Sequence, residues 1–507
     1  MSQSRAKASA RLARRVFEGV SAVRGPVVVL EGVTGVGYNE AAEVLLPDGS
    51  VRRGRVLEAS HDATVVEVWD GTAGIAINSA RVRFAGHGLR FPVSLAMLGR
   101  TFDGLARPID DMLAPLPEEM VDANGTPMNP VRRAYPRDLI VTGVSAIDVT
   151  NTLVRGQKLP IFTGAGLPHN QLAAQIAGQA HLLESDQDFA VVFVAMGVKH
   201  DDASFFAQRF RESGAMASAA VFLNLADDPP MERIVAPRAA LSLAEHLAFQ
   251  HGMHVLVIMT DMTNYGEALR ELSSARDEVP SRKGYPGYLY SDLASLYERT
   301  GMLRDRPGSI TQLPILSMPN DDISHPMPDL TGYITEGQLV LSRALDARGI
   351  YPPLDILPSL SRLMKDSIGE GLTRSDHPAV ANQLYAACSH VQEVESLASV
   401  IGADALSPRD RRYLRFGEAF EELLLKQRPD ESRALDESLD LAWQVLSVLP
   451  EEELSRISDR ELAHRYLGDE ALERAGSATS MGLLGRQLSP SGDAELSRRH
   501  AEKEGKG

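Results

Sequence analysis

Phe162-Thr-Gly-Ala-Gly-Leu-Pro-His-Asn170 is the stretch that decides the predicted fold of this chain. The short apolar run Leu159–Phe162 leads into it, and a helical pattern follows from Gln171. A strand, a glycine-containing loop and a helix in that order are typical of a phosphate-binding loop, whose backbone N–H groups wrap the phosphates. The stretch therefore predicts an α/β domain of the nucleotide-binding type.

The loop lacks the residues that such a loop uses for chemistry. A working loop reads G-x-x-x-x-G-K-[ST], whereas Thr163, Pro168, His169 and Asn170 stand at the four specified places. Proline contributes no N–H, and histidine is shorter than lysine and mostly neutral at pH 7. We therefore expect a degenerate, weak nucleotide site with little hydrolysis of its own, formed by Gly164, Ala165, Gly166, Leu167, Pro168, His169 and Asn170.

Two later positions bear on the same site. The apolar strand Val255–Met259 leads to Asp261, where nucleotide-hydrolysing relatives hold Mg²⁺, so Asp261 is added to the weak site. Val198 follows another strand at the place where related ATPases carry a glutamate that polarises the attacking water. With neither the lysine nor this carboxylate, the chain is predicted to be non-catalytic, and no metal ligands are assigned to it.

Arg362 offers a different contribution to catalysis. It ends the segment Pro358-Ser-Leu-Ser-Arg362, and an arginine on a proline-fixed loop is usually a surface ion-pair partner. Beside a disabled phosphate loop, we favour an arginine finger that acts in trans on a neighbour's nucleotide.

Composition limits the remaining possibilities. The net charge of −16 and the pI near 5.3 argue against nucleic acid as a partner, because such binding depends on basic residues. A single cysteine excludes an internal disulfide and fits the cytosol. The longest apolar runs are far shorter than the roughly 18–20 residues that span a bilayer, so we expect no transmembrane segment.

Patterning along the chain predicts a multidomain α/β protein. Short β-rich runs recur about every ten residues in the first domain, continuous apolar strands alternate with helices in the second, and helices alone fill the third. We expect an N-terminal β-barrel, a central P-loop-type α/β nucleotide-binding domain with a parallel sheet, and a C-terminal helical domain. The expected segments are a basic arm at 1–24, the barrel at 25–98, the α/β domain at 99–375, the helical domain at 376–470, and a disordered tail at 471–507.

Individual elements follow from the same patterns. Ser407 and Pro408 predict a helix start, with Ser407 as N-cap. Apolar spacing predicts a helix over 435–449 that includes Trp443. The remaining expected elements are strands at 189–195, 219–225 and 255–259 and helices at 202–212 and 237–250.

Several longer strings resemble one family, the non-catalytic B subunit of V-type and archaeal-type rotary ATPases. The similarity runs from about Gly25 to about Leu449. Its most specific strings are Ser94–Arg100, Asn124–Arg133, Gly164–Asn170, Phe222–Asp228, Thr260–Tyr265, Pro319–Asp322, Asp329–Gly337 and Leu357–Arg362.

The resemblance implies a regulatory subunit of a proton- or sodium-translocating ATPase or ATP synthase. It implies an A3B3 hexamer with catalytic A subunits, around a central shaft and joined to a peripheral stalk and, indirectly, to a membrane ion-translocating sector. Arg362 matches the family's arginine that reaches the γ-phosphate on a neighbouring A subunit. ATP or ADP would lie at subunit interfaces, with Mg²⁺ on the catalytic partner and none held tightly by this chain. The complex would be peripheral on the cytoplasmic side of the membrane.

Two alternatives remain open at this stage. One is an autonomous P-loop ATPase with a degenerate loop, and the other is a ring-forming helicase relative, which the acidic balance disfavours.

Overall fold

The computed structural model describes residues 15–468 except 61, 78, 126–127, 184–187 and 277. The chain forms two compact units. The first comprises Met1–Thr142, Thr152–Ser342 and Pro358–Ser367, and the second comprises Gly143–Asn151, Arg343–Leu357 and Ile368–Gly507. The predicted tail and most of the predicted N-terminal arm lie outside the described residues.

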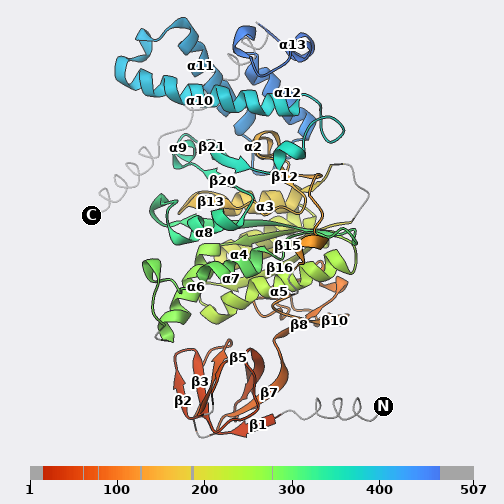
Figure 1. The fold of residues 1–507 in the computed structure, drawn as a ribbon, viewed down its shortest axis with the longest axis vertical. Coiled ribbons are helices and arrows are strands. Elements are labelled where there is room, and N and C mark those ends of the chain that lie inside the picture. Colours follow the sequence, from red (N-terminus) through yellow and green to blue (C-terminus); the bar gives the residue numbers. More distant parts are fainter. Residues whose placement is uncertain are drawn as a thin grey trace, which may run out of the picture. The chain divides into compact units, whose positions relative to one another are not determined.

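The N-terminal part of the first unit is a β-barrel of antiparallel strands (Figure 1). Alternate side chains such as Val44, Val66 and Val82 point inward and are fully buried, because successive side chains of a strand face opposite sides of the sheet. The strands follow the order β1-β7-β4-β5-β6-β3-β2. Their bounds are β1 Arg15–Glu18, β2 Ala22–Arg24, β3 Val27–Glu31, β4 Glu40–Leu45, β5 Val51–Ala59, β6 Ala63–Val68 and β7 Arg81–Gly88.

The start of the barrel differs from the expected boundary at residue 25. Strands β1 and β2 lie inside the predicted arm and pair with β7 and β3. Each has only three or four residues, too few to show an alternating pattern. Their strand conformation depends on pairing, of β1 with the distant β7 and of β2 with β3 across a turn. The chain therefore enters the barrel at Arg15.

The rest of the first unit is built on a sheet with the order β21-β20-β13-β19-β17-β15-β16-β9. The pairings from β20 through β9 are parallel, and β18 joins β19 antiparallel. Its central strands are apolar and buried throughout, because helices cover both faces. The strands are β9 Thr101–Asp103, β13 Ile161–Gly164, β15 Phe189–Val198, β16 Ala219–Leu225, β17 His254–Thr260, β18 Gly301–Met302, β19 Ser309–Met318, β20 Gly337–Leu341 and β21 Leu354–Ser361.

Helices and short strands complete this unit, with α4 to α8 beside the sheet in Figure 1. The helices are α3 His169–Gln179, α4 His200–Glu212, α5 Pro230–Phe249, α6 Met262–Ala275, α7 Leu289–Tyr297 and α8 Pro326–Ile334. The short strands are β8 Arg90–Val93, β10 Glu119–Asp122, β11 Leu139–Val141, β12 Leu153–Val154 and β14 His181–Leu182.

The expected start of one helix at Pro237 is wrong. Helix α5 begins at Pro230, in the first turn where a missing N–H costs nothing, and continues through a buried Pro237. Burial of most of this helix against the sheet outweighs the hydrogen bond that an internal proline removes. The predicted strands at 189–195, 219–225 and 255–259 correspond to β15, β16 and β17.

The second unit is helical. Ser407 caps α11 by accepting a hydrogen bond from the Asp410 N–H, with Pro408 at the first helical position, as predicted. Trp443 is buried and its Nε1 donates to Asp376 Oδ2 over 2.7 Å. The helices are α2 Ser145–Thr150, α9 Arg343–Ala347, α10 His377–Ile401, α11 Pro408–Ala419, α12 Leu435–Leu446 and α13 Asp459–Arg465.

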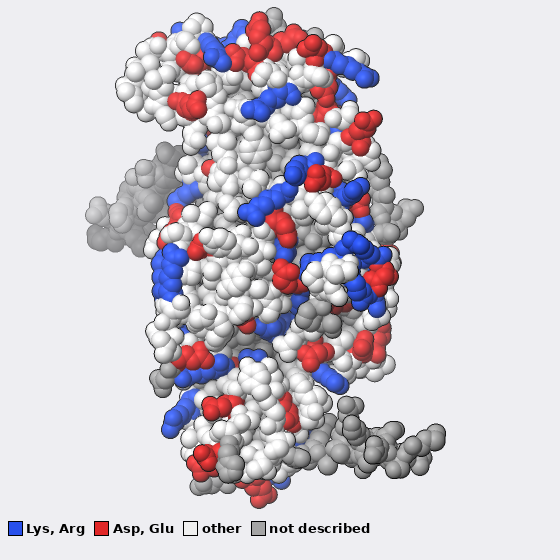
Figure 2. Space-filling view, viewed as in Figure 1, with Lys and Arg blue, Asp and Glu red and all other residues white. Residues whose placement is uncertain are grey.

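Among the described residues, no helix combines the length and hydropathy needed to cross a bilayer. Basic and acidic side chains are interspersed over the face shown in Figure 2.

Candidate functional site

The predicted phosphate loop lies where the sequence places it. Strand β13 ends at Gly164 and helix α3 begins at His169, with Gly166 at φ +84°, a conformation that favours glycine. The loop's own backbone uses two of its donors, since Leu167 N donates to Gly164 O (3.2 Å) and His169 N to Leu167 O (2.8 Å). Fewer N–H groups are thus free to bind phosphate than in a loop that leaves its amides open.

The side chains at the two decisive positions are also engaged. His169 folds back so that its Nδ1 lies 3.0 Å from Leu167 O. Asn170 Nδ2 donates to Asp202 Oδ1 over 3.1 Å, from the first turn of α4. A carboxylate therefore lies one hydrogen bond from the position that binds Mg²⁺ through a hydroxyl in a working loop, and it repels an incoming phosphate.

Asp261 lies at the same edge of the sheet as the loop, at the carboxyl end of β17. It caps α6, and Oδ1 accepts hydrogen bonds from Thr263 N (2.8 Å) and Ser317 N (3.0 Å). The Ser317 hydroxyl donates to the other carboxylate oxygen. Protein donors thus occupy both oxygens of this nearly buried side chain, so Asp261 ties β17, α6 and β19 together.

Apolar and neutral groups and one guanidinium surround the position where the sequence lacks a water-orienting carboxylate, and Arg233 Nε donates to Asn224 Oδ1 over 2.9 Å. Val198 is buried at the end of β15. Beside it, the Asn224 amide oxygen accepts from Gly197 N (3.1 Å), and Asn264 Nδ2 donates to Met196 O (2.9 Å). The amide side chains of Asn224 and Asn264 are not basic, so they cannot take a proton from an attacking water.

Arg362 is exposed directly after β21, and its guanidinium makes no ion pair or hydrogen bond with any residue that the structure describes. Its backbone N donates to Glu336 O (2.9 Å), and Glu336 N donates to Lys158 O (3.1 Å). Arg362 is therefore level with Lys158, six residues before Gly164 on the chain that forms β13. At ~3.3 Å per residue, this places Arg362 about 20 Å from the loop, near the opposite ends of the parallel strands.

Buried groups fix the chain directly before Arg362. Ser361 Oγ donates to Thr152 O (2.8 Å) and accepts from Gln157 Nε2 (3.0 Å). Gly337 has φ +144°, and a Cβ there would lie 2.0 Å from Leu360 O. The guanidinium is thus mounted on a backbone that side chains and close packing hold in place.

Local sequence patterns contain no sign of these anchors. Gln157, Glu336 and Gly337 have no motif of their own, and the hydrogen bonds of Gln157 and Glu336 join residues 178 to 204 positions apart.

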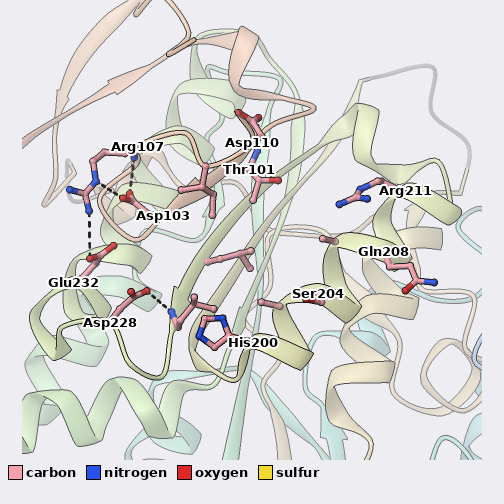
Figure 3. A pocket seen from close by; sticks show the side chains of 15 residues that line it. Thr101, Asp103, Arg107, Asp110, His200, Ser204, Gln208, Arg211, Asp228 and Glu232 are labelled. Atoms are coloured by element: carbon pink, nitrogen blue, oxygen red, sulfur yellow. Dashed lines mark hydrogen bonds and ion pairs between the residues drawn. The ribbon is translucent and has the colours of Figure 1, made fainter. Parts of the chain in front are cut away.

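A cavity of about 760 Å³ lies beside the carboxyl ends of β9 and β16, and none of the predicted site residues lines it. In Figure 3, Arg107 points toward Asp103 and Glu232, while Gln208 and Arg211 approach from α4. Burial, reinforced by the nearby carboxylates Asp103 and Asp228, raises the pKa of Glu232 to about 7. The sequence gives no signal for this cavity, because its acidic residues come from separate elements.

Replacing Glu232 by Gln is expected to stabilise the chain more at pH 8 than at pH 5. The folded pKa exceeds the usual value of 4.5, so between about pH 4.5 and 7 the folded state binds more protons than the unfolded state. The wild type therefore loses stability as pH rises through 7, by about 1–3 kcal/mol, and the glutamine variant does not. Unfolding midpoints of both proteins at the two pH values test this, and an equal difference at pH 5 and pH 8 would contradict it.

Comparison with known proteins agrees with this architecture. Residues 20–86 match the beta-barrel domain of the ATP synthase alpha/beta family, and residues 143–361 match its nucleotide-binding domain. Residues 366–466 match the C-terminal domain of V and A type ATP synthase. The chain therefore belongs to the ATP synthase alpha/beta family.

Similar full-length proteins narrow the assignment. The V-type ATP synthase beta chain of Halothermothrix orenii is 62% identical over 89% of this chain and 98% of its own length. The B subunit of the A-type ATP synthase of Aeropyrum pernix is 58% identical over 88% of this chain and 97% of its own. A solved structure, the ATP synthase subunit NeqB from Nanoarcheaum equitans, is 38% identical with a TM-score of 0.65, covering 83% of this chain and 98% of that one. Within the family, the chain is a B subunit, or beta chain, of a V/A-type ATP synthase.

Proposed function

We propose that this chain is a non-catalytic, regulatory subunit that supplies Arg362 in trans to the ATP site of a neighbouring catalytic subunit. The observation that carries the proposal is the placement of Arg362. It is exposed, unpaired among the described residues, and about 20 Å along the sheet from the chain's own loop. Such a guanidinium cannot serve a nucleotide on the same loop but can meet one bound to another subunit.

The loop Gly164–Asn170 supports the non-catalytic half of the proposal. The start of helix α3 would retain weak affinity for ATP or ADP at a subunit interface. The turned-back His169, the nearby Asp202 and the apolar Val198 support this reading, because none of the three can activate water for attack on the γ-phosphate as a well-placed glutamate does. Mg²⁺ and turnover therefore belong to the catalytic partner.

The proposed assembly is a ring in which three copies alternate with three catalytic A subunits around a central shaft. A peripheral stalk and an ion-translocating membrane sector complete it, with the ring on the cytoplasmic side. The relatives, which are themselves named as ATP synthase beta chain and B subunit, motivate this arrangement. Purification of this chain from its native source tests it: a lysine-bearing homologous subunit should accompany it, and recovery of the chain alone under mild conditions would count against it.

The ion that the complex moves, H⁺ or Na⁺, is a separate question. ATP-driven uptake into vesicles that carry the complex, measured with and without Na⁺, distinguishes the two.

The competing function is an autonomous ATPase with an unusual loop. It requires the isolated chain to hydrolyse ATP with Mg²⁺ and to lose this activity on His169→Ala. We expect the isolated chain to show no such turnover.

His169→Lys alone is expected to leave the isolated chain without ATPase activity. The lysine restores one contact to phosphate, but Pro168 still lacks an N–H and Val198 still leaves no water-orienting carboxylate. Phosphate release from purified wild type and variant, at saturating Mg²⁺ and ATP, measures this. Turnover near the ~1–100 s⁻¹ of ordinary enzymes of this kind would show that one residue is enough. His200→Lys is the control for added charge, because it also replaces a histidine at the start of a helix that follows a strand of the sheet.

A further inference from the structure

Three potential metal ligands converge at a place that the proposed function does not use. His246 Nε2 lies 3.0 Å from Glu118 Oε2, and His251 Nε2 lies 2.8 Å from the same oxygen. The two Nε2 atoms are 3.3 Å apart. Two imidazoles and one carboxylate thus face a common point, although Glu118 is separated from His246 by 128 residues.

The protein holds the carboxylate so that one oxygen is left for these rings. Glu118 immediately precedes β10, and its other oxygen, Oε1, accepts hydrogen bonds from Leu95 N (2.9 Å) and Ser94 Oγ (3.2 Å). These two bonds orient the carboxylate and leave Oε2 as a single-oxygen ligand.

The hydrogen-bonding pattern of His246 is incomplete without a cation. Its side chain is buried near the end of α5, and Nδ1 has no hydrogen-bond partner among the described residues. The carboxylate of Glu119 lies 3.9 Å from that Nδ1. If the neutral ring carries its proton on Nε2 and donates to Glu118, the lone pair of Nδ1 faces the carboxylate of Glu119, which is unfavourable. A metal on Nε2 reverses the tautomer and turns an N–H toward Glu119, the outer partner that metal-bound histidines commonly have.

The spacing suits a tetrahedral ion. Bond lengths of about 2.0–2.1 Å from Zn²⁺ to imidazole nitrogen place two such nitrogens about 3.3 Å apart in a tetrahedron, which matches the separation of the two Nε2 atoms. The carboxylate oxygen is a few tenths of an ångström closer than this and would retreat on binding. Mg²⁺ and Ca²⁺ prefer all-oxygen sites, whereas two imidazoles and a carboxylate suit zinc.

We propose that Glu118, His246 and His251 bind one Zn²⁺ ion, with a fourth position open to water. The ion would join the start of β10 to the C-terminal end of α5 and to the connection that leads into β17. Its role would be structural, since it fastens three segments of the first unit and involves neither Arg362 nor the loop Gly164–Asn170.

Zinc titration of the purified full-length chain, stripped with a chelator and set against a chromophoric competitor, tests the proposal. We expect one equivalent of Zn²⁺ per chain, a rise in the unfolding temperature, and Co²⁺ absorption typical of tetrahedral coordination. His251→Ala and Glu118→Gln should each weaken binding by more than about 100-fold, beyond the roughly 10–100-fold that loss of an outer-shell partner costs. Glu119→Gln should fall within that smaller range.

His200→Ala is the matched control, because His200 also faces a carboxylate, that of Asp227 at 3.3 Å, but belongs to no cluster of three among the described residues. It should bind zinc as the wild type does. His251 is exposed, so its replacement should leave the fold intact, which circular dichroism would verify. Absence of stoichiometric zinc binding, or equal affinity in the wild type and His251→Ala, would overturn the proposal and leave a purely hydrogen-bonded trio.

Discussion

Arg362→Ala is expected to lower the ATPase activity of the assembled complex by about 10³–10⁵-fold while leaving the ring intact. The exposed side chain makes no hydrogen bond or ion pair with described residues that its loss would break. Its backbone remains held by Glu336, and its neighbour Ser361 by Gln157. The loss therefore falls on the stabilisation of charge at the neighbour's γ-phosphate. Turnover of the reconstituted complex, with assembly checked by size-exclusion chromatography, measures it.

Two further variants make this test specific. Arg362→Lys should fail almost as completely, because a single ammonium does not reproduce the planar fork of guanidinium donors. Lys365→Ala removes one positive charge three residues away on the same exposed segment and should retain near-normal turnover. Equal losses in Lys365→Ala and Arg362→Ala would mean that general electrostatics, not a finger, is responsible, and near-normal activity of Arg362→Ala would defeat the assignment.

Gly337→Ala is expected to destabilise the first unit by about 3 kcal/mol or more. The new Cβ would lie 2.0 Å from Leu360 O, and a backbone carbonyl cannot rotate away as a side chain can. The φ of +144° adds strain for any residue with a Cβ. Thermal unfolding should show a midpoint lower by roughly 6 °C or more.

Gly332→Ala is the control for this change. Gly332 lies within helix α8, and the nearest atom to its Cβ would be 3.9 Å away, at ordinary contact distance. Alanine there should leave stability unchanged or raise it by up to about 1 kcal/mol, through helix propensity. If Gly337→Ala behaved like Gly332→Ala, the close approach at Leu360 would not be a constraint.

The parts of the fold that the sequence predicted are those with strong local signals. Strands β15, β16 and β17 are continuous apolar runs, and Ser407-Pro408 carries its own capping chemistry. The parts that it did not predict depend on distant partners. Strands β1 and β2 are too short to show a pattern, and Pro237 is tolerated only because tertiary burial supports α5.

In the candidate site, too, residues with local sequence signals could be predicted and contacts between distant elements could not. The loop and Asp261 could be placed from sequence because each ends a recognisable strand, and the structure brings them to one edge of the sheet. Their contacts could not be predicted, since the bond from Asn170 to Asp202 and the bonds from Ser317 to Asp261 cross between elements. The trio of Glu118, His246 and His251 left no signal either, because its spacing matches no metal-binding motif.

The separation of Arg362 from the loop gives the chain a polarity. If Arg362 acts as proposed, one end of the sheet delivers a cation and the other presents a loop that cannot use one. In a ring made only of such chains, every junction would pair an arginine with an inert loop, and no junction would turn over. Activity then requires a different chain at every second position. A ring of wrong composition would therefore be inactive without the action of any separate regulator.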